Sequence, residues 1–166
     1  MKLEKLIWLG LTLLVFGASA QVVTDPDQKE TDTPTPPSFN KDKLIPIEMP
    51  SYVSLRFGVD PATLSITPDG IVRYVMVAIN ATGSVTAMYE GIRCASGEVK
   101  TYARSNASGQ WSGVKDPQWQ DWNDKLPSHH AFALARQGAC EGRAASGSSV
   151  ADVVKALKNP LQNQTR

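Results

Sequence analysis

Residues 71–79, Ile-Val-Arg-Tyr-Val-Met-Val-Ala-Ile, are rich in valine and isoleucine, which favour β-structure. Residues 80–83, Asn-Ala-Thr-Gly, have the chemistry of a hairpin loop, and residues 84–94 have the pattern of a returning strand. A turn at residues 95–97 leads into another strand at residues 98–104. This succession predicts a meander of antiparallel strands with residues 71–79 as its most apolar member.

The flanking residues extend the sheet and then change to helical patterns. Residues 52–57 alternate as a first strand, and residues 117–122 predict a short turn of helix. Ser128 is a candidate cap for a helix over residues 129–137, and Ser149 opens a second helix through a capping box. Strands followed by helices predict an α+β fold, in which the C-terminal helices pack on the antiparallel sheet.

The first 20 residues have the three parts of a cleavable signal peptide. Lys2 and Lys5 supply positive charge, residues 6–16 are apolar, and residues 18–20, Ala-Ser-Ala, give the small-x-small cleavage pattern. The apolar stretch is shorter than the roughly 20 residues of a membrane-spanning helix. We therefore expect cleavage before Gln21, no transmembrane anchor afterwards and a periplasmic location. A lipoprotein is not expected, because the mature chain would begin with glutamine instead of cysteine.

Composition divides the rest of the chain into three parts. Residues 21–50 are polar and proline-rich, which predicts a disordered spacer because such a stretch buries too little apolar surface to offset its conformational entropy. Residues 51–159 have the length of a single domain with one core, and we assign the whole α+β fold to them. Residues 160–166 remain as a flexible tail.

Cys94 and Cys140 are the two cysteines of the chain. In an oxidising compartment, such a pair is most simply one disulfide. The spacing is not that of a Cys-x-x-Cys redox motif, and the distant histidines do not supply a zinc-ligand pattern. The predicted bridge would tie the end of a central strand to the end of a helix and stabilise the fold by about 4 kcal/mol.

Charge and motif content exclude several classes of function. The chain has 17 basic and 16 acidic residues. Cleavage of the predicted signal peptide would remove two basic residues and one acidic residue, so the mature chain would be formally neutral. A nucleic-acid partner is not expected, because binding to phosphates needs a basic face. Motifs for a serine nucleophile, a phosphate-binding loop or a calcium loop are missing, and His129 and His130 lack a third ligand. We expect no catalytic residue, no cofactor and no metal.

A polar row is predicted across the meander. If the two hairpin loops have four and three residues, Arg73 and Tyr102 both lie opposite Glu90, with Lys100 nearby. Two interpretations stay open: a structural ion pair with the tyrosine hydroxyl as an added donor, or a ligand site where Arg73 or Lys100 meets an acidic group. A shift of one residue in register would dissolve the row.

One aromatic cluster alternates with acidic residues: Trp111, Trp119, Trp122, Asp116, Asp121 and Asp124. In the predicted turn of helix, Trp119 and Trp122 would share a face. Stacking on a sugar ring beside paired acids suggests an alternative function, a cell-wall glycan hydrolase. The competing interpretation is that the tryptophans anchor a loop to the core.

Several stretches also match a known pattern: residues 57–60 (FGVD), 69–74 (DGIVRY), 89–94 (YEGIRC), 100–103 (KTYA) and Trp111. Over residues 52–140 the chain resembles the cryptic neisserial protein one-like family, proteobacterial envelope proteins of uncharacterised function. The resemblance implies a Gram-negative periplasmic or outer-envelope setting and transfers no catalytic residue. Members of that family are expected to be lipoproteins, and Gln21 departs from that pattern.

The expected function is therefore that of a non-enzymatic binding or envelope-assembly module in the periplasm. Its partner would be an envelope protein or a cell-wall ligand. The candidate binding residues are Arg73, Glu90, Lys100 and Tyr102.

Overall fold

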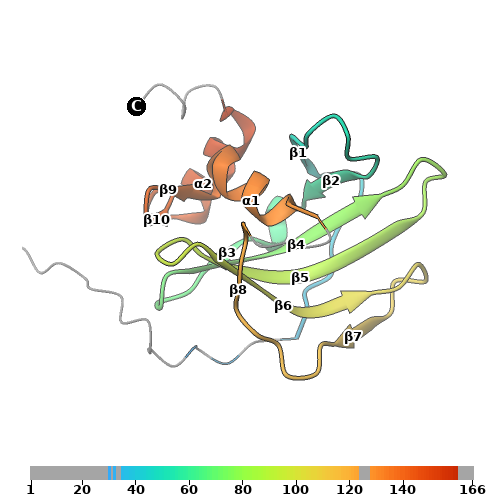
Figure 1. Ribbon diagram of the computed structural model, residues 1–166, viewed down its shortest axis with the longest axis horizontal. Coiled ribbons are helices and arrows are strands. Elements are labelled where there is room, and N and C mark those ends of the chain that lie inside the picture. Colours follow the sequence, from blue (N-terminus) through green and yellow to red (C-terminus); the bar gives the residue numbers. More distant parts are fainter. Residues whose placement is uncertain (1–29, 31, 33–34, 124–127, 161–166) are drawn as a thin grey trace, which may run out of the picture.

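Strand β4 (Ile71–Ile79) lies at the centre of the sheet, as its composition predicts, and is buried along almost its whole length. The computed structural model describes Glu30, Asp32, residues 35–123 and residues 128–160. Strand β4 pairs antiparallel with β5 (Val85–Arg93), which pairs antiparallel with β6 (Glu98–Ser105). The predicted meander and the predicted α+β class are confirmed (Figure 1).

Shorter elements complete the sheet on both sides of the meander. Its order is β1-β2-β4-β5-β6-β7, while β3 pairs with β4 and β8 with β6. The bounds are β1 Ile45–Ile47, β2 Arg56–Val59, β3 Ser65–Ile66, β7 Trp111–Gly113 and β8 Gln120–Asp121, with a 3-10 turn η1 at Pro61–Thr63.

Several local predictions are wrong. The first strand, predicted at residues 52–57, is instead β2 and begins only at Arg56. Strand β1 lies inside the predicted spacer of residues 21–50, because Ile45 and Ile47 bury their side chains even though Pro46 separates them. A proline is tolerated there because β1 is an edge strand, where one backbone N–H can be missing. The predicted turn of helix at residues 117–122 is instead an extended segment that contains β8.

The C-terminal half supplies the helices. Helix α1 (His130–Leu134) continues into a wider π turn, η2 (Ala135–Ala139), and α2 (Val150–Lys158) follows. Between them, β9 (Cys140–Glu141) and β10 (Ala144–Ala145) form a small hairpin. The capping box predicted at the start of α2 is confirmed. Among the described residues, helices of the length and apolarity needed to cross a bilayer are absent.

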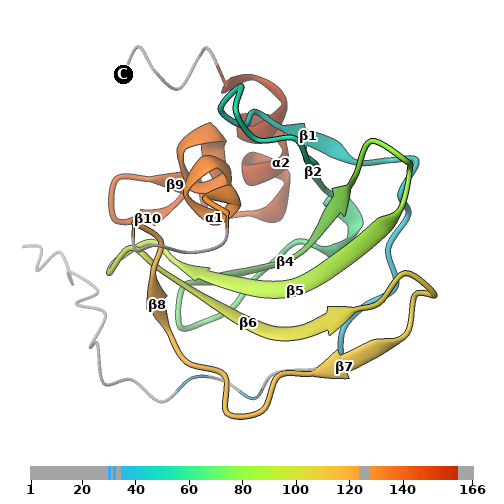
Figure 2. The same ribbon diagram turned by 45° about the vertical axis from the view of Figure 1, so that its right-hand side comes forward.

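Different parts of the chain cover the two faces of the sheet. The helices cover the face that carries Val72, Tyr74 and Met76 (Figure 1). The opposite face carries a second core, consisting of Val75, Val77, Ala87, Tyr89, Tyr102 and Ala103. Phe39 and Leu44 pack against this second core, and Figure 2 shows their segment running from β1 past β5 and β6 toward β7.

The predicted disulfide between Cys94 and Cys140 is present, with the two Cα atoms 5.7 Å apart. Cys94 directly follows β5, and Cys140 begins β9 at the end of the π turn. The bridge therefore links the central sheet to the helical layer. It fixes the position of the helices relative to the strands that carry the candidate residues.

Candidate functional site

The hairpin between β4 and β5 differs from its predicted register by one residue. Ile79 pairs with Val85 instead of Ser84, so the loop has five residues, 80–84. The side-chain oxygen of Asn80 holds this longer loop, accepting the backbone N–H of Thr82 at 3.0 Å and of Ser84 at 2.8 Å. Consequently Glu90 no longer lies opposite Arg73.

This shift moves Glu90 to the other face of the sheet. Arg73 pairs with Gly91, and Glu90 pairs with Tyr74. Because side chains alternate along a strand, Glu90 points toward the helices while Arg73 points away from them. The predicted row of Arg73, Glu90 and Tyr102 is therefore wrong as a single row.

The second hairpin loop has four residues, 94–97, instead of three, so Lys100 pairs with Gly91 and lies on the side of Arg73, and alternation along β6 puts Tyr102 on that side too. A β-bulge follows in β6. The register shifts between Tyr89 and Glu90, which pair with Ala103 and Thr101, so Tyr102 is the extra residue. A bulge lets one strand carry an additional side chain on a face. Three of the four predicted residues thus gather on one face, and we call Arg73, Lys100 and Tyr102 the three-donor cluster.

The three-donor cluster converges on the carboxylate of Glu30. Lys100 Nζ donates to Glu30 Oε2 at 2.7 Å, Arg73 Nη2 donates to Oε1 at 3.2 Å, and the Tyr102 hydroxyl also donates to Oε1. Arg73 Nη1 donates in addition to the backbone carbonyl of Asp32 at 3.2 Å. The cluster therefore does hold an acidic group, and that group comes from the segment that the sequence predicts to be a spacer.

The surroundings of the cluster favour a charged carboxylate. The side chain of Arg73 is 3% exposed, and that of Glu30 is 14% exposed. Burial raises the pKa of Glu30, but hydrogen bonds from Lys100 and Tyr102 outweigh it, and the net pKa lies below its ordinary value. Burial and the contact with Glu30 raise the pKa of Tyr102, so its hydroxyl stays a neutral donor.

Gly91 makes room for the cluster. It lies opposite Arg73 on one side and Lys100 on the other. A Cβ atom at Gly91 would lie 2.6 Å from the Tyr102 hydroxyl oxygen and 2.9 Å from Cγ2 of Ile71. Sequence reasoning missed this residue, although a glycine inside a well-marked strand is itself a signal of close packing.

Aromatic rings border the two cations. The guanidinium carbon of Arg73 lies 5.4 Å from the centre of the Tyr102 ring, and Lys100 Nζ lies 5.1 Å from the Trp119 ring. The guanidinium carbon of Arg93 also lies over the Trp119 ring, 4.2 Å from its centre. These are cation-π distances, so Trp119 helps to hold the cationic groups in place.

The predicted cluster of tryptophans and acids does not form among the described residues. Trp111 packs edge-on against Phe39 at 6.2 Å, and Trp122 packs near Phe132 at 6.4 Å. The carboxylate of Asp121 accepts hydrogen bonds within its own turn, Asp116 is exposed, and Asp124 lies outside the described residues. Trp119 and Trp122 share no helical face because their segment is extended.

Glu90, on the opposite face, is a buried junction between sheet and helix. It accepts hydrogen bonds from Tyr74 at 3.1 Å and Thr101 at 3.0 Å, and pairs with His130 Nε2 at 2.8 Å. Burial raises the pKa of Glu90, but the charge and hydrogen bond of His130 outweigh it, so the pKa lies below its ordinary value. This carboxylate joins β4, β6 and α1.

Ser128, His130 and Glu90 stand in a row of hydrogen bonds, with Ser128 Oγ 2.6 Å from His130 Nδ1. Ser128 is therefore not the helix cap that its position predicts; the cap position belongs to His129 and carries no side-chain hydrogen bond. The His130 ring is buried and stacks on Phe57 at 5.2 Å. We assign the row a structural role because its base and acid are both enclosed in the core.

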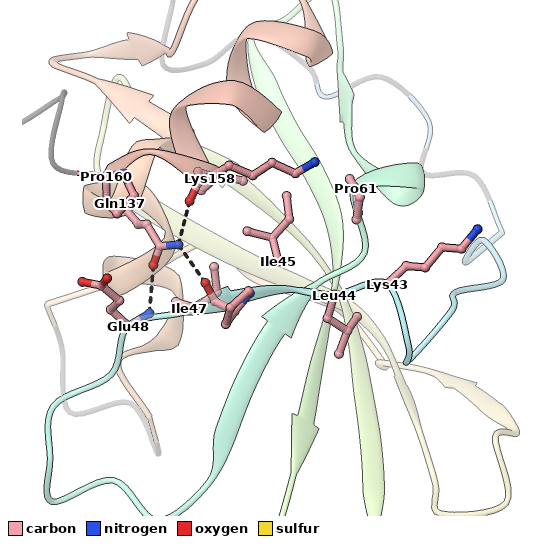
Figure 3. Close-up of a pocket in the computed structure, with 11 residues that line it drawn as sticks. Lys43, Leu44, Ile45, Ile47, Glu48, Pro61, Gln137, Lys158 and Pro160 are labelled. Carbon is pink, nitrogen blue, oxygen red and sulfur yellow. Dashed lines mark hydrogen bonds between the residues drawn. The ribbon is translucent and has the colours of Figure 1, made fainter.

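A cavity of ≈ 470 Å³ lies beside β1, on the side of α2 (Figure 3). The Gln137 carboxamide donates to the backbone carbonyls of Pro46 at 2.8 Å and Leu157 at 3.0 Å, and accepts the N–H of Glu48 at 2.8 Å. Pro46 and Glu48 carry the outward-facing groups that a further strand would use. Gln137 thus satisfies the sheet edge, and these polar groups are already committed.

The fold and the cluster define the class: a disulfide-linked α+β domain whose sheet presents converging donors to a carboxylate. The chain belongs to the CNP1-like family, whose model matches residues 23–158. This confirms the resemblance and extends it, since the match includes the segment that carries Glu30 and reaches the end of α2. Comparisons with curated proteins and with solved structures found no match.

Proposed function

We propose that this protein is an exported, non-enzymatic binding module of the bacterial cell envelope, and that the three-donor cluster is its ligand site. The ligand is a carboxylate group carried by an envelope protein or a cell-wall fragment. Export is supported by the signal-peptide pattern of the first 20 residues and by the disulfide, since disulfides persist in oxidising compartments.

One observation carries the proposal: a guanidinium, an ammonium and a hydroxyl from two strands converge on one carboxylate. Charge-assisted hydrogen bonds of this kind are stronger than neutral ones, and arginine is well suited to carboxylates. Among the described residues, Arg73 and Lys100 both contact the carboxylate of Glu30, so the site is built from cationic donors. Such donors favour anionic ligands.

The chemistry of the cluster supports binding over catalysis. A general acid or base works best with a pKa near the operating pH. In this cluster the pKa of Tyr102 is raised and that of Glu30 is lowered, so both move away from neutrality. Burial lowers the pKa of Arg73, but contacts with Tyr102 and Glu30 raise it more. These shifts suit a fixed electrostatic clamp.

The proposal is tested by vacating the site. In the full mature chain, Glu30→Ala removes the resident carboxylate, and acetate is titrated while the amide and side-chain signals of Lys100 and Tyr102 are followed by NMR. Saturable shifts at millimolar acetate are expected for Glu30→Ala and weaker ones for the unaltered chain. Asp42→Asn is the matched control, because Asp42 is an exposed acid of the same segment.

A folded Glu30→Ala chain that shows no saturable shift would contradict the proposal. Thermal melting and near-ultraviolet circular dichroism establish that the variant is folded. Glu30→Gln is the second variant, because it keeps the shape of the side chain while removing its charge, and it should shift less with acetate than Glu30→Ala.

A further inference from the structure

The segment that supplies Glu30 makes further contacts along the sheet. We call Glu30, Asp32 and residues 35–44 the covering segment. The backbone N–H of Asn40 donates to the Asp60 carboxylate at 2.7 Å, and Phe39 packs edge-on against Trp111. Leu44 packs where Gly58 leaves space, since a Cβ at Gly58 would lie 2.8 Å from the Leu44 Cβ. The covering segment is thus attached at separate points.

These attachments are of the kind that hold a bound peptide. Residues 35–40 have no regular secondary structure, and the described part of the segment before β1 pairs with no strand. The anchors are single groups: the Glu30 carboxylate, the Phe39 ring and the Asn40 amide. Proline at positions 36 and 37 favours the extended conformation that peptide ligands adopt on binding surfaces.

The surface beneath the covering segment has the composition of an acceptor site. It consists of the second core, with Val75, Tyr89 and Ala103, beside the buried Arg73. Removing the carboxylate of Glu30 takes away an ion-pair partner of Arg73 and of Lys100, and breaking a buried ion pair is costly. Exchange of one carboxylate for another avoids this cost.

We propose that the covering segment is a tethered pseudo-ligand, and that the partner bound at this face is an extended acidic polypeptide segment that displaces it. This inference rests on the proposed function of the three-donor cluster. The partner places a carboxylate side chain in the cluster and an aromatic side chain against Trp111. Its spacing follows that of Glu30 and Phe39, which are nine positions apart in the sequence.

The tether sets the conditions for displacement. A segment joined to its site by a short linker competes at an effective concentration of about millimolar. A partner in solution can bind only to molecules whose segment is released. Its apparent affinity is therefore its intrinsic affinity multiplied by the fraction of molecules in that released state. Removing the side chains of Glu30 and Phe39, two of these anchors, should raise the affinity for a partner without altering the acceptor surface.

The test uses a fluorescent peptide with the sequence of residues 28–44, which presents the pseudo-ligand in trans. Binding to the full mature chain is measured by fluorescence anisotropy. The released variant Glu30→Ala/Phe39→Ala is expected to bind this peptide at least ten-fold more tightly than the unaltered chain. A peptide carrying Glu30→Gln should lose at least ten-fold in affinity for the released variant.

Two further variants make the result specific. Adding Lys100→Gln to the released variant should abolish peptide binding, because it removes one donor of the cluster. Asp42→Asn leaves the Glu30 and Phe39 anchors in place and should bind as weakly as the unaltered chain. Intact near-ultraviolet circular dichroism and an oxidised disulfide show that each variant is folded.

The outcomes separate this inference from the proposed function. If acetate binds to Glu30→Ala but the peptide does not bind to the released variant, the carboxylate site stands and the pseudo-ligand inference is overturned. Equal affinity of the peptide for the released and unaltered chains also overturns it, since the segment would not compete. If neither acetate nor peptide binds, both proposals fail.

Discussion

Gly91 and Tyr102 occupy the same small volume on the sheet: a Cβ at Gly91 would lie 2.6 Å from the tyrosine hydroxyl oxygen. That hydroxyl is one of the donors to Glu30. The glycine therefore controls whether the tyrosine can reach the carboxylate.

We predict that Gly91→Ala displaces Tyr102 and lowers the free energy of unfolding by about 2 kcal/mol, the usual cost of overpacking. Urea unfolding at pH 7 measures the change. Gly113→Ala is the matched control, because Gly113 lies in β7 with open space around its Cα, and it should change stability by less than about 0.5 kcal/mol. Equal losses of stability in the two variants would contradict the inference that a side chain at Gly91 displaces Tyr102.

Glu90 should make the protein sensitive to acid. Its pKa is lower in the folded chain than in the unfolded chain, so the unfolded chain binds more protons in this range. The stabilisation is fully present above the unfolded pKa of about 4.3 and is lost as pH falls through the folded pKa. We predict that Glu90→Gln lowers the free energy of unfolding by about 3 kcal/mol at pH 7, because it breaks a buried pair.

The same variant should flatten the dependence on pH. Urea unfolding of both chains between pH 7 and pH 3 measures this difference, and the gap between them should shrink toward acid pH. Glu98→Gln provides the control, since Glu98 forms a partly exposed pair with Arg93 and should cost less than about 1 kcal/mol. A gap that is constant across the pH range would contradict the assignment of Glu90 as a charged partner of His130.

Reduction of the disulfide should destabilise the fold, while the three-donor cluster keeps its donors because neither cysteine belongs to it. Cys94 and Cys140 are 46 positions apart, for which the chain-entropy model gives about 4 kcal/mol. We predict this loss for the double variant Cys94→Ala/Cys140→Ala and for the reduced chain. Guanidinium unfolding with and without a reducing agent measures it. An unchanged midpoint in reducing conditions would argue against the bridge as a major contribution.

Gln137 should protect the free edge of the sheet. Its carboxamide bonds to the carbonyls of Pro46 in β1 and Leu157 in α2 and to the N–H of Glu48, just after β1; the bond to Leu157 is buried, and an unsatisfied buried group costs about 1–3 kcal/mol. We predict that Gln137→Ala lowers the free energy of unfolding by about 2 kcal/mol and promotes association through β1, because exposed edges pair with other chains. Urea unfolding and size-exclusion chromatography measure the two effects, and Gln110→Ala, at an exposed loop position, should show neither.

The elements predicted correctly are those whose signals are local. Residues 71–79 carry their strand propensity in their own side chains, and the capping box at Ser149 is complete within four residues. Strand β1 was not predicted from its own residues. Ile45 and Ile47 form a strand only by pairing with Val59 and Phe57 of β2, and their own stretch does not show that pairing. Long-range pairing of this kind leaves little trace in a short, proline-containing stretch.

The candidate site was predicted in part, for a similar reason. Arg73, Lys100 and Tyr102 do meet, but the fifth loop residue held by Asn80 shifts the register of β5, so Glu90 points to the other face. Register depends on such single residues, and composition does not reveal them. Glu30 carries no periodic signal at all, so its role depends on where the rest of the chain folds.

The bridge between Cys94 and Cys140 has a consequence for a protein exposed to proteases. The two cysteines enclose β6, β7 and α1, and with them Lys100 and Tyr102. A single cut anywhere in this loop leaves two fragments that remain joined covalently, one with Arg73 and the other with α2. A nicked molecule would thus migrate intact on a non-reducing gel and as two pieces after reduction, while its pieces stay together in solution.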